Sequence, residues 1–392
     1  MAIGQKDWFM IDPESVYLTH GTFGACLKVA FDSKIEWQQK IESDPFDFLN
    51  NHAINNLEHS RKVLGNYLTC DYDDIVYFPN PSTALNAVIK SLKLKKGDEV
   101  LTSNHEYGSL DRTWQYYAHS KGYNYKQINI DIPYNDKNIF LDSFLKSITK
   151  KTKIIYLSHI TSSTGLVFPV KEICEIARKN NIISIIDGAH APGQIEVNIS
   201  DINPDIYVGA CHKWMCSPKG ASFLYANKNI QNSIEPLVIS WGWKSDTPGK
   251  SKFLDYHQYQ GTNDISAYLT IPEIVNFFDI NQWDKIQNKC HNVVLDFLKD
   301  NINKIEPCST NSDHLAQMLS FKINKNSQLI KNVFDSPIGI IEAQNKIFDY
   351  NKIHIPIIIW NQEIFTRLSI QAYNTPQDLV RLLDMLIHFN LL

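Results

Sequence analysis

The sequence predicts an α/β fold, with a large domain on a mostly parallel seven-stranded sheet and a smaller α+β domain after it. Between about residues 73 and 226, short apolar runs alternate with longer amphipathic segments. The apolar runs lack regular polar alternation, which is typical of parallel strands covered on both faces. After about residue 265 the pattern changes to amphipathic helices and short strands. These observations predict two structural units of different architecture.

Seven apolar runs are the expected strands of the large sheet, at 73–78, 98–103, 123–130, 153–159, 182–187, 205–210 and 221–227. Amphipathic segments between them are the expected helices, at 82–94, 109–122, 140–148 and 170–180. Ligands of such sheets bind beyond the carboxyl ends of the strands. The functional side chains are therefore expected at that edge.

The remaining third of the chain is expected to form the smaller domain. Its expected helices lie at 266–281, 285–305 and 376–389, and its expected strands lie at 315–323, 353–359 and 365–370. We therefore predict three parts. Residues 1–20 form an N-terminal segment that contributes to the small domain and the substrate mouth, residues 21–265 form the large domain, and residues 266–392 form the small C-terminal domain. We find no internal repeat and no low-complexity linker.

Composition excludes several classes of function. The 392 residues are 43% hydrophobic and 20% charged, as in globular proteins, and the net charge of −4 comes without a long basic block, so neither nucleic acid nor an anionic membrane is an expected partner. No apolar stretch reaches the roughly 20 residues of a membrane span, and the N-terminus lacks a secretory signal pattern. We predict a cytoplasmic protein. Its seven cysteines contain no Cys-x-x-Cys pair, so we expect reduced thiols and no metal site.

Two strand ends each deliver a charged group. The stretch "IISIIDGAHAPGQ" ends its apolar run on Asp187, and "DIYVGACHKWMCSPKG" ends its run on His212 and Lys213. Pyridoxal phosphate needs an amine to bond its aldehyde and an anion to keep its ring nitrogen protonated, and Lys213 and Asp187 meet these needs. Taken alone, the lysine also fits a solvated strand end and the aspartate an N-cap or Asx turn.

The cofactor also needs donors for its phosphate and a flat side chain against its ring. In "FPNPSTALNAV", Ser82 and Thr83 open a helix whose free N–H groups and dipole favour an anion, although a simple N-cap fits as well. Tyr107 of "SNHEYGSL" follows a strand and is the candidate stacking ring, or else an ordinary core or surface aromatic. Together these signals predict a site for pyridoxal 5'-phosphate.

In this combination the sequence resembles the fold-type I pyridoxal phosphate enzymes, which have the aspartate-aminotransferase-like fold. Within them it resembles the class V aminotransferase branch, which also contains cysteine desulfurases and isopenicillin N epimerase. The resemblance extends from "YLTHGTFGA" to "FTRLSIQAYNT" and is most specific in "DGAHAPG", "CHKW" and "RLSIQAYNT". The stretch "HGTFGA" and the pair of Tyr107 with His190 are closer to the isopenicillin N epimerase-like subgroup.

The resemblance implies a role for each cofactor contact. Lys213 would hold the cofactor covalently, Asp187 would pair with the pyridine nitrogen, and Tyr107 would stack on the ring. His190 would approach the phenolic oxygen, where Ser162 of "HITSSTG" stands in place of the asparagine of desulfurases. The phosphate would be held by His212 and the turn at Ser82 and Thr83, joined by Thr262 of "YQGTND" from a second subunit, which implies a homodimer with a shared active site.

On the substrate side, Arg367 of "TRLS" would grip the α-carboxylate of an amino-acid-like substrate as a two-pronged fork. The alternative for this arginine is a surface salt bridge. His20, Thr22 and Phe23 are expected walls of the substrate pocket. The stretch "SWGWKS" and the insert at 244–257 fit a substrate mouth, although core tryptophans and a plain surface loop fit them as well.

Two departures from the desulfurases narrow the activity. Ala210 stands where they carry a phosphate-binding serine, and no cysteine precedes Arg367 in "FDYNKIHIPIIIWNQEIF", where they keep their nucleophile. A persulfide-forming desulfurase is therefore not expected. We expect an epimerase-like enzyme that removes a Cα proton. A lyase that eliminates a C–S or other β-substituent is the alternative, followed by an aminotransferase, whereas a binding module without chemistry is disfavoured because Lys213, Asp187 and Arg367 are all present.

Overall fold

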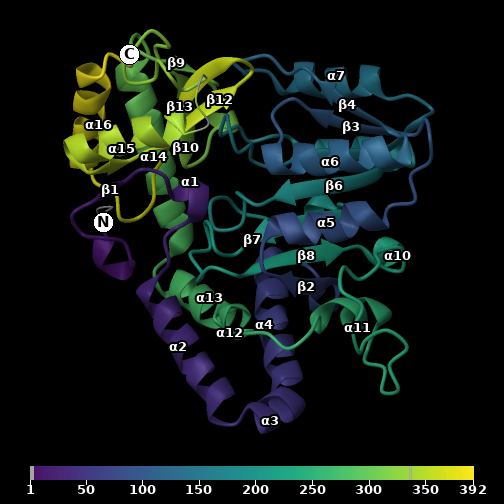
Figure 1. Ribbon diagram of the computed structural model, residues 1–392. Helices are drawn as coiled ribbons and strands as arrows, with labels where there is room; N and C mark the ends of the chain where they lie inside the picture. Colours follow the sequence, from purple (N-terminus) through teal and green to yellow (C-terminus); the bar gives the residue numbers. More distant parts are fainter. Residues whose placement is uncertain (1–3, 335, 337) are drawn as a thin grey trace.

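The computed structural model describes residues 4–334, 336 and 338–392, and its largest element is a seven-stranded sheet (Figure 1). The strands run in the order β2-β8-β7-β6-β5-β3-β4. Every neighbouring pair is parallel except the pairs of β8 with β7 and with β2. This confirms the predicted α/β class. The strands are β2 (Ile75–Phe78), β3 (Glu99–Ser103), β4 (Asn124–Ile128), β5 (Thr152–Ser158), β6 (Ile183–Gly188), β7 (Ile206–Ala210) and β8 (Ser222–Ala226).

Alternating side chains of the central strands enter two different cores. On β5, Ile154 and Tyr156 belong to one buried cluster, whereas Ile155 and Leu157 belong to the other. Fully burying one such side chain contributes about 1.5–3 kcal/mol. Strands of this kind carry almost no polar side chain except at their ends, which is why charged groups gather there.

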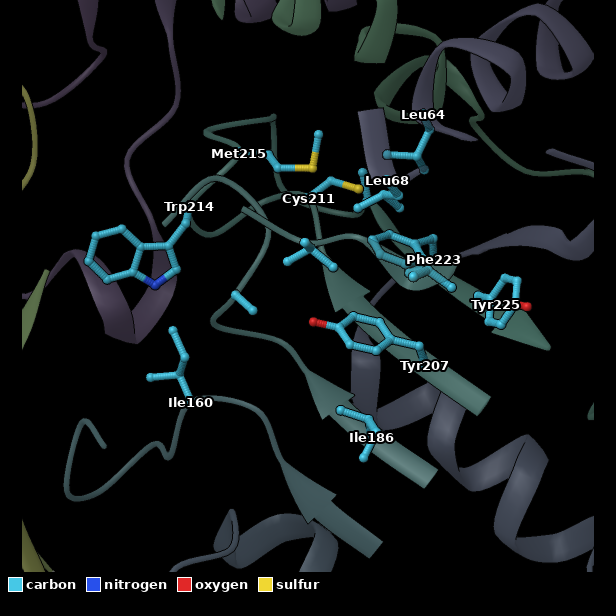
Figure 2. Close-up of a cluster of buried hydrophobic side chains, with 14 of the residues drawn as sticks. Leu64, Leu68, Ile160, Ile186, Tyr207, Cys211, Trp214, Met215, Phe223 and Tyr225 are labelled. Atoms are coloured by element: carbon cyan, nitrogen blue, oxygen red, sulfur yellow. The ribbon is translucent and has the colours of Figure 1, made fainter. Parts of the chain in front are cut away.

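Helices cover both faces of the sheet (Figure 1). One core includes α5 (Pro81–Ser91), α6 (Gly108–Lys121) and α11 (Lys252–Gln258). The opposite core includes α2 (Lys28–Ser43), α4 (Ala53–Leu68), α7 (Lys137–Ser147), α8 (Val170–Lys179), α9 (Ile199–Ile202), α12 (Ser266–Leu269) and α13 (Ile271–Ile280). Figure 2 shows part of this second core, in which Tyr207 and Phe223 lie beneath the turn that carries Cys211, Trp214 and Met215. The remaining short helices are α1 (His20–Phe23), α3 (Pro45–Asp47) and α10 (Lys228–Gln231).

The start of α5 is fixed by local sequence. Asn80 is its N-cap and accepts a hydrogen bond from the Thr83 N–H at 2.8 Å, while Pro81 fills the first helical position. Because β2 and β7 are both antiparallel to β8, they point the same way. The N-terminus of α5 therefore lies at the same edge of the sheet as the carboxyl ends of β6 and β7.

The C-terminal part forms a separate antiparallel sheet, which confirms the predicted α+β architecture (Figure 1). Its strands are β12 (Ile357–Trp360), β13 (Glu363–Ser369), β10 (Met318–Lys322) and β9 (Glu306–Pro307), in that order, with helices α14 (Trp283–Asn301), α15 (Gly339–Asn351) and α16 (Pro376–His388). The N-terminal strand β1 (Val16–Tyr17) pairs with β11 (Ile353–His354), and Val16 and Leu18 enter the core of this part.

The predicted domain boundaries remain predictions. The N-terminal segment predicted at 1–20 includes residues 1–3, which lie outside the described residues. Helices α12 and α13, predicted within the small domain at 266–281, contribute Leu269 and Ile274 to a core of the large sheet. No helix among the described residues is long and apolar enough to cross a membrane.

Candidate active site

A pocket lies at the edge where the parallel strands end. Asp187 stands near the end of β6, and Lys213 follows the end of β7 by three residues. Nine of the residues predicted from the sequence line this one pocket, namely Thr22, Phe23, Ser82, Tyr107, Ser162, Asp187, His190, His212 and Lys213. His20, Thr83, Thr262 and Arg367 are not among its lining residues.

The backbone of Lys213 contacts helix α1, which lies near the N-terminus of the chain. His20 Nε2 lies 3.1 Å from the Lys213 carbonyl oxygen, and Nδ1 of the same ring lies 3.0 Å from the Tyr373 hydroxyl. Gly24 has φ +73°, and a Cβ at this position would collide with the His212 carbonyl. The close approach that glycine permits therefore lets α1 close over the turn that carries the lysine.

The Lys213 amine has unusual surroundings for a lysine. Its Nζ lies 3.1 Å from His190 Nε2 and 6.0 Å from the centroid of the Tyr107 ring. The pKa of Lys213 is lowered to about 8, mainly by burial; Asp187 acts against this shift and Arg367 adds to it. About a tenth of this amine is therefore uncharged at pH 7, far more than for an ordinary lysine, which suits a nucleophile or a base.

Asp187 is a buried carboxylate that can accept further hydrogen bonds. It is 4% exposed, and its Oδ1 accepts from the Ala189 N–H at 3.0 Å while Oδ2 accepts from the Tyr156 hydroxyl at 3.2 Å. Burial raises the pKa of Asp187, and the two hydrogen bonds and Lys213 act against this rise. Each oxygen still has a free lone pair, so the group can accept a further hydrogen bond from a cationic ring nitrogen.

The opposite end of the pocket offers donors for an anion. Asn80, Pro81 and Ser82 at the start of α5 line it, together with His212. The His212 Nδ1–H donates to the Ala221 carbonyl at 2.8 Å, which leaves Nε2 for a ligand. Thr83 lies one position farther along the helix, and its N–H and its hydroxyl both donate to Asn80 Oδ1. Its predicted phosphate contact remains a prediction.

Arg367 lies on β13 behind the pocket wall. It is 2% exposed; Nη2 donates to Thr22 Oγ1 at 3.2 Å, and Nη1 donates to the Ser162 carbonyl. Its Nε has no partner, and no carboxylate of the described residues pairs with the guanidinium. Burial lowers the pKa of Arg367 to about 10. Because a buried charge without a counterion is costly, this arrangement favours an anionic ligand.

Thr262 lies in a different hollow, together with the insert predicted at 244–257. This second hollow, hereafter the Thr262 hollow, has mainly apolar walls that include Ile54, Leu57, Trp241 and Ile265. The Thr262 hydroxyl lies 3.1 Å from the Tyr259 hydroxyl. The insert therefore borders this hollow and does not line the Lys213 pocket, and the contribution of Thr262 to a second subunit stays a prediction.

One buried acid beside the pocket was not found from the sequence. Glu106 is 4% exposed, and it accepts from the Ser103 hydroxyl at 2.6 Å and from the N–H and hydroxyl of Ser158 at 2.9 and 2.6 Å. Burial raises the pKa of Glu106 to about 8. The available signal was an acid directly before Tyr107 at the end of a buried strand. Asn80, whose amide caps α5, was also missed.

The cysteines lie away from this chemistry. All seven are free, and none is among the residues that line the Lys213 pocket. Within the described part of the chain, no group of three or more His, Cys, Asp or Glu side chains is placed to hold a metal ion.

Comparison with known proteins gives relatives for this architecture. The chain is 29% identical over 278 residues to isopenicillin N epimerase from Streptomyces clavuligerus, covering 68% of this chain and 70% of that protein. It is 24% identical to a probable chloroplastic L-cysteine desulfhydrase from Arabidopsis thaliana, covering 95% and 82%. A mutant of C-DES with glycine covalently linked to its PLP cofactor has a similar fold, with a TM-score of 0.82 at 20% identity over 96% and 97% of the two chains. The sequence profile described as Aminotransferase class-V matches residues 40–382. The chain therefore belongs to the class V aminotransferase family.

Proposed function

We propose that this protein is a pyridoxal phosphate-dependent enzyme that removes the Cα proton of an amino acid or a related metabolite, with epimerisation as its outcome. The observation that carries the proposal is the combination of a partly buried amine of lowered pKa on Lys213, a buried carboxylate on Asp187 and a buried guanidinium on Arg367 that lacks an acidic partner. Similarity to isopenicillin N epimerase supports the same reading.

The side chains present fit this cofactor. When bound, pyridoxal phosphate bonds an amine through its aldehyde and accepts the electron pair released at Cα. Lys213 supplies the amine, and the free lone pairs of Asp187 suit a protonated ring nitrogen. The start of α5 at Ser82 and the free Nε2 of His212 suit a phosphate. The ring of Tyr107, which is 44% exposed and lines the pocket, offers a flat surface.

The residues around Cα then have separate tasks. The uncharged amine of Lys213 accepts the Cα proton, for which a pKa near the working pH is favourable. Arg367, held by Thr22 and the Ser162 carbonyl, orients the substrate through its carboxylate. This orientation decides which Cα bond is aligned for cleavage, because the guanidinium fork fixes the carboxylate in one plane. Epimerisation is complete when Cα takes a proton from water on its opposite face and Lys213 releases the first proton to solvent.

The second candidate is β-elimination, of a C–S bond in particular. The relative named as a probable L-cysteine desulfhydrase matches 95% of this chain, which favours a reaction that begins with the same proton removal. No cysteine lines the Lys213 pocket, so such a reaction would use the substrate's own leaving group and no persulfide on the protein. Amino transfer is a third outcome of the same first step.

Incubation with candidate amino acids in heavy water tests this proposal. Epimerisation predicts deuterium at Cα and inverted configuration, β-elimination predicts a keto acid with ammonia, and amino transfer predicts a requirement for a second keto acid. Lys213→Ala serves as the control and should show none of these products. Failure of every amino acid to exchange its Cα proton, with cofactor bound at full occupancy, would contradict the proposed function.

A further inference from the structure

The indole N–H of Trp214 contacts the active-site histidine. Trp214 follows Lys213 directly, its side chain is fully buried, and its Nε1 donates to His190 Nδ1 at 3.3 Å. An indole nitrogen can only donate a hydrogen bond. His190 Nδ1 must therefore be the acceptor, so the neutral imidazole carries its proton on Nε2.

This assignment also defines the state of the lysine. His190 Nε2 lies 3.1 Å from Lys213 Nζ. If Nε2 carries the proton, it donates, and Lys213 must accept through the lone pair of an uncharged amine. Burial, followed by Lys213 and Arg367, holds the pKa of His190 well below its ordinary value, and burial lowers the pKa of Lys213 to about 8. Both shifts favour the neutral forms that these hydrogen-bond directions require, and the Lys213 amine is mostly uncharged above about pH 8.

The groups that face His190 do not favour its cationic form. Lys213 from the turn after β7, Arg367 from β13 and His20 from α1 all lower its pKa. His20 itself is held neutral, since burial lowers its pKa to about 3. Asp187, on β6, accepts hydrogen bonds from the Tyr156 hydroxyl and the Ala189 N–H. His190 is therefore neutral, and the hydrogen bond from Trp214 determines which of its ring nitrogens carries the proton.

The backbone around this contact leaves little freedom. Gly193 has φ +88°, and a Cβ at this position would collide with the Trp214 carbonyl, so the turn after β6 lies directly against the turn after β7. The Gln194 amide donates to the His190 carbonyl at 2.7 Å. In Figure 2 the indole extends away from Cys211 and Met215.

We propose that Trp214 is a positioning residue that locks His190 in the Nε2-protonated tautomer and thereby presents Lys213 with a hydrogen-bond donor, which favours the uncharged form of its amine. The consequence for catalysis rests on the proposed function. The tautomer itself is a property of the chain without any ligand.

The substitution Trp214→Phe tests this role, because it removes the N–H while keeping an aromatic ring. In the cofactor-free protein labelled with ¹⁵N-histidine, we expect wild-type His190, assigned by comparison with His190→Gln, to show the Nε2-protonated pattern in long-range ¹H–¹⁵N spectra. In the variant the Nδ1-protonated form should appear. Its Nε2 would then accept from a charged amine, so acetic anhydride labelling of Lys213 at pH 7 should slow about tenfold, with its pH midpoint moved upward.

Trp283→Phe is the matched control. Trp283 lies in the same core, and its Nε1 donates to the Gly193 carbonyl at 3.2 Å without touching His190. This control should change neither the tautomer nor the labelling midpoint. An Nδ1-protonated His190 in the wild-type protein would overturn the inference even if Trp214→Phe fails to fold. Identical spectra and midpoints in wild type and Trp214→Phe would overturn it as well. Neither readout involves a cofactor, so failure of the proposed function would leave these results standing.

Discussion

The Lys213 pocket and the Thr262 hollow are opposite in character. The pocket gathers Lys213, Asp187 and His190 at the sheet edge, and burial shifts the pKa of each. The hollow is mainly apolar, with Trp241 82% exposed and Ile54 61% exposed on its walls. A large exposed apolar surface is typical of a region that another molecule covers. We therefore propose that the titrating groups of the reaction come from one chain and that the hollow packs against a second copy, which would complete the phosphate site.

The largest expected effect is on the pocket side. Replacing the amine by Lys213→Ala should reduce turnover by at least about 10³-fold, because both the nucleophile and the base are lost. Sedimentation analysis should find the oligomeric state unchanged, because Lys213 does not line the Thr262 hollow. Turnover within tenfold of wild type would show that the pocket is not the reacting centre.

A smaller effect is expected at Arg367. Arg367→Lys keeps a positive charge but loses the fork that reaches both Thr22 and Ser162, so kcat/KM should fall by about 100-fold. Arg367→Gln should fall at least as far. Steady-state kinetics with the best substrate measures both variants. A lysine variant with unchanged kinetics would contradict a carboxylate-binding role for Arg367, which is buried and not in a surface salt bridge.

Two glutamates, one from each region, should give opposite pH dependences of stability. The pKa of Glu106 is raised to about 8 by burial, whereas hydrogen bonds from Lys62 and Lys250 lower the pKa of Glu58 at the hollow. Glu106 binds its proton more tightly in the folded protein, so its contribution to the free energy of unfolding should fall as pH rises from about 4.5 to 8. The contribution of Glu58 should be present above about pH 4.5 and lost as pH falls.

Denaturant unfolding of wild type, Glu106→Gln and Glu58→Gln across pH 4 to 9 measures both contributions. Glu106→Gln should gain stability relative to wild type above pH 8, because the glutamine stays neutral. The Glu58 effect should stay within about 1 kcal/mol, as for exposed ion pairs. Parallel pH profiles for the two variants would remove this distinction between the regions.

The exposed tryptophan of the hollow tests the proposed homodimer. Trp241→Ser should weaken self-association by about tenfold or more, because exposed tryptophans are frequent anchors of protein interfaces. Tyr116→Ser is the control, since Tyr116 is 69% exposed on α6 and outside the hollow. Analytical ultracentrifugation measures both. A fully active monomeric wild-type protein would contradict the shared site.

The smallest effect is expected at Thr262. Thr262→Val removes one hydroxyl and should weaken cofactor binding by about tenfold or less, the range of one hydrogen bond. Equilibrium dialysis against pyridoxal phosphate measures it. The covalent attachment at Lys213 should persist, because the threonine does not line that pocket. Loss of the covalent attachment in this variant would contradict the separate roles of the Lys213 pocket and the Thr262 hollow.

The sequence predicted the elements better than their assembly. The strand expected at 182–187 is observed as Ile183–Gly188, since a continuous apolar run has few alternatives to a buried strand. The strand order and the antiparallel placement of β8 depend on contacts between distant segments, which periodicity does not encode.

The same limit applies to the site. Asp187 and Lys213 were found because each directly follows an apolar run. Glu106 was missed because its burial depends on Ser103 and Ser158, which two different strands bring together. The role of Asn80 was missed because a cap is recognised only when its amide is seen to accept the Thr83 N–H and hydroxyl.

Reduction of the cofactor-loaded protein with borohydride, followed by peptide mass spectrometry, tests the central claim most directly. The account predicts a single pyridoxyl group on the peptide that contains Lys213. A label on another lysine, or no label after saturation with pyridoxal phosphate, would contradict it.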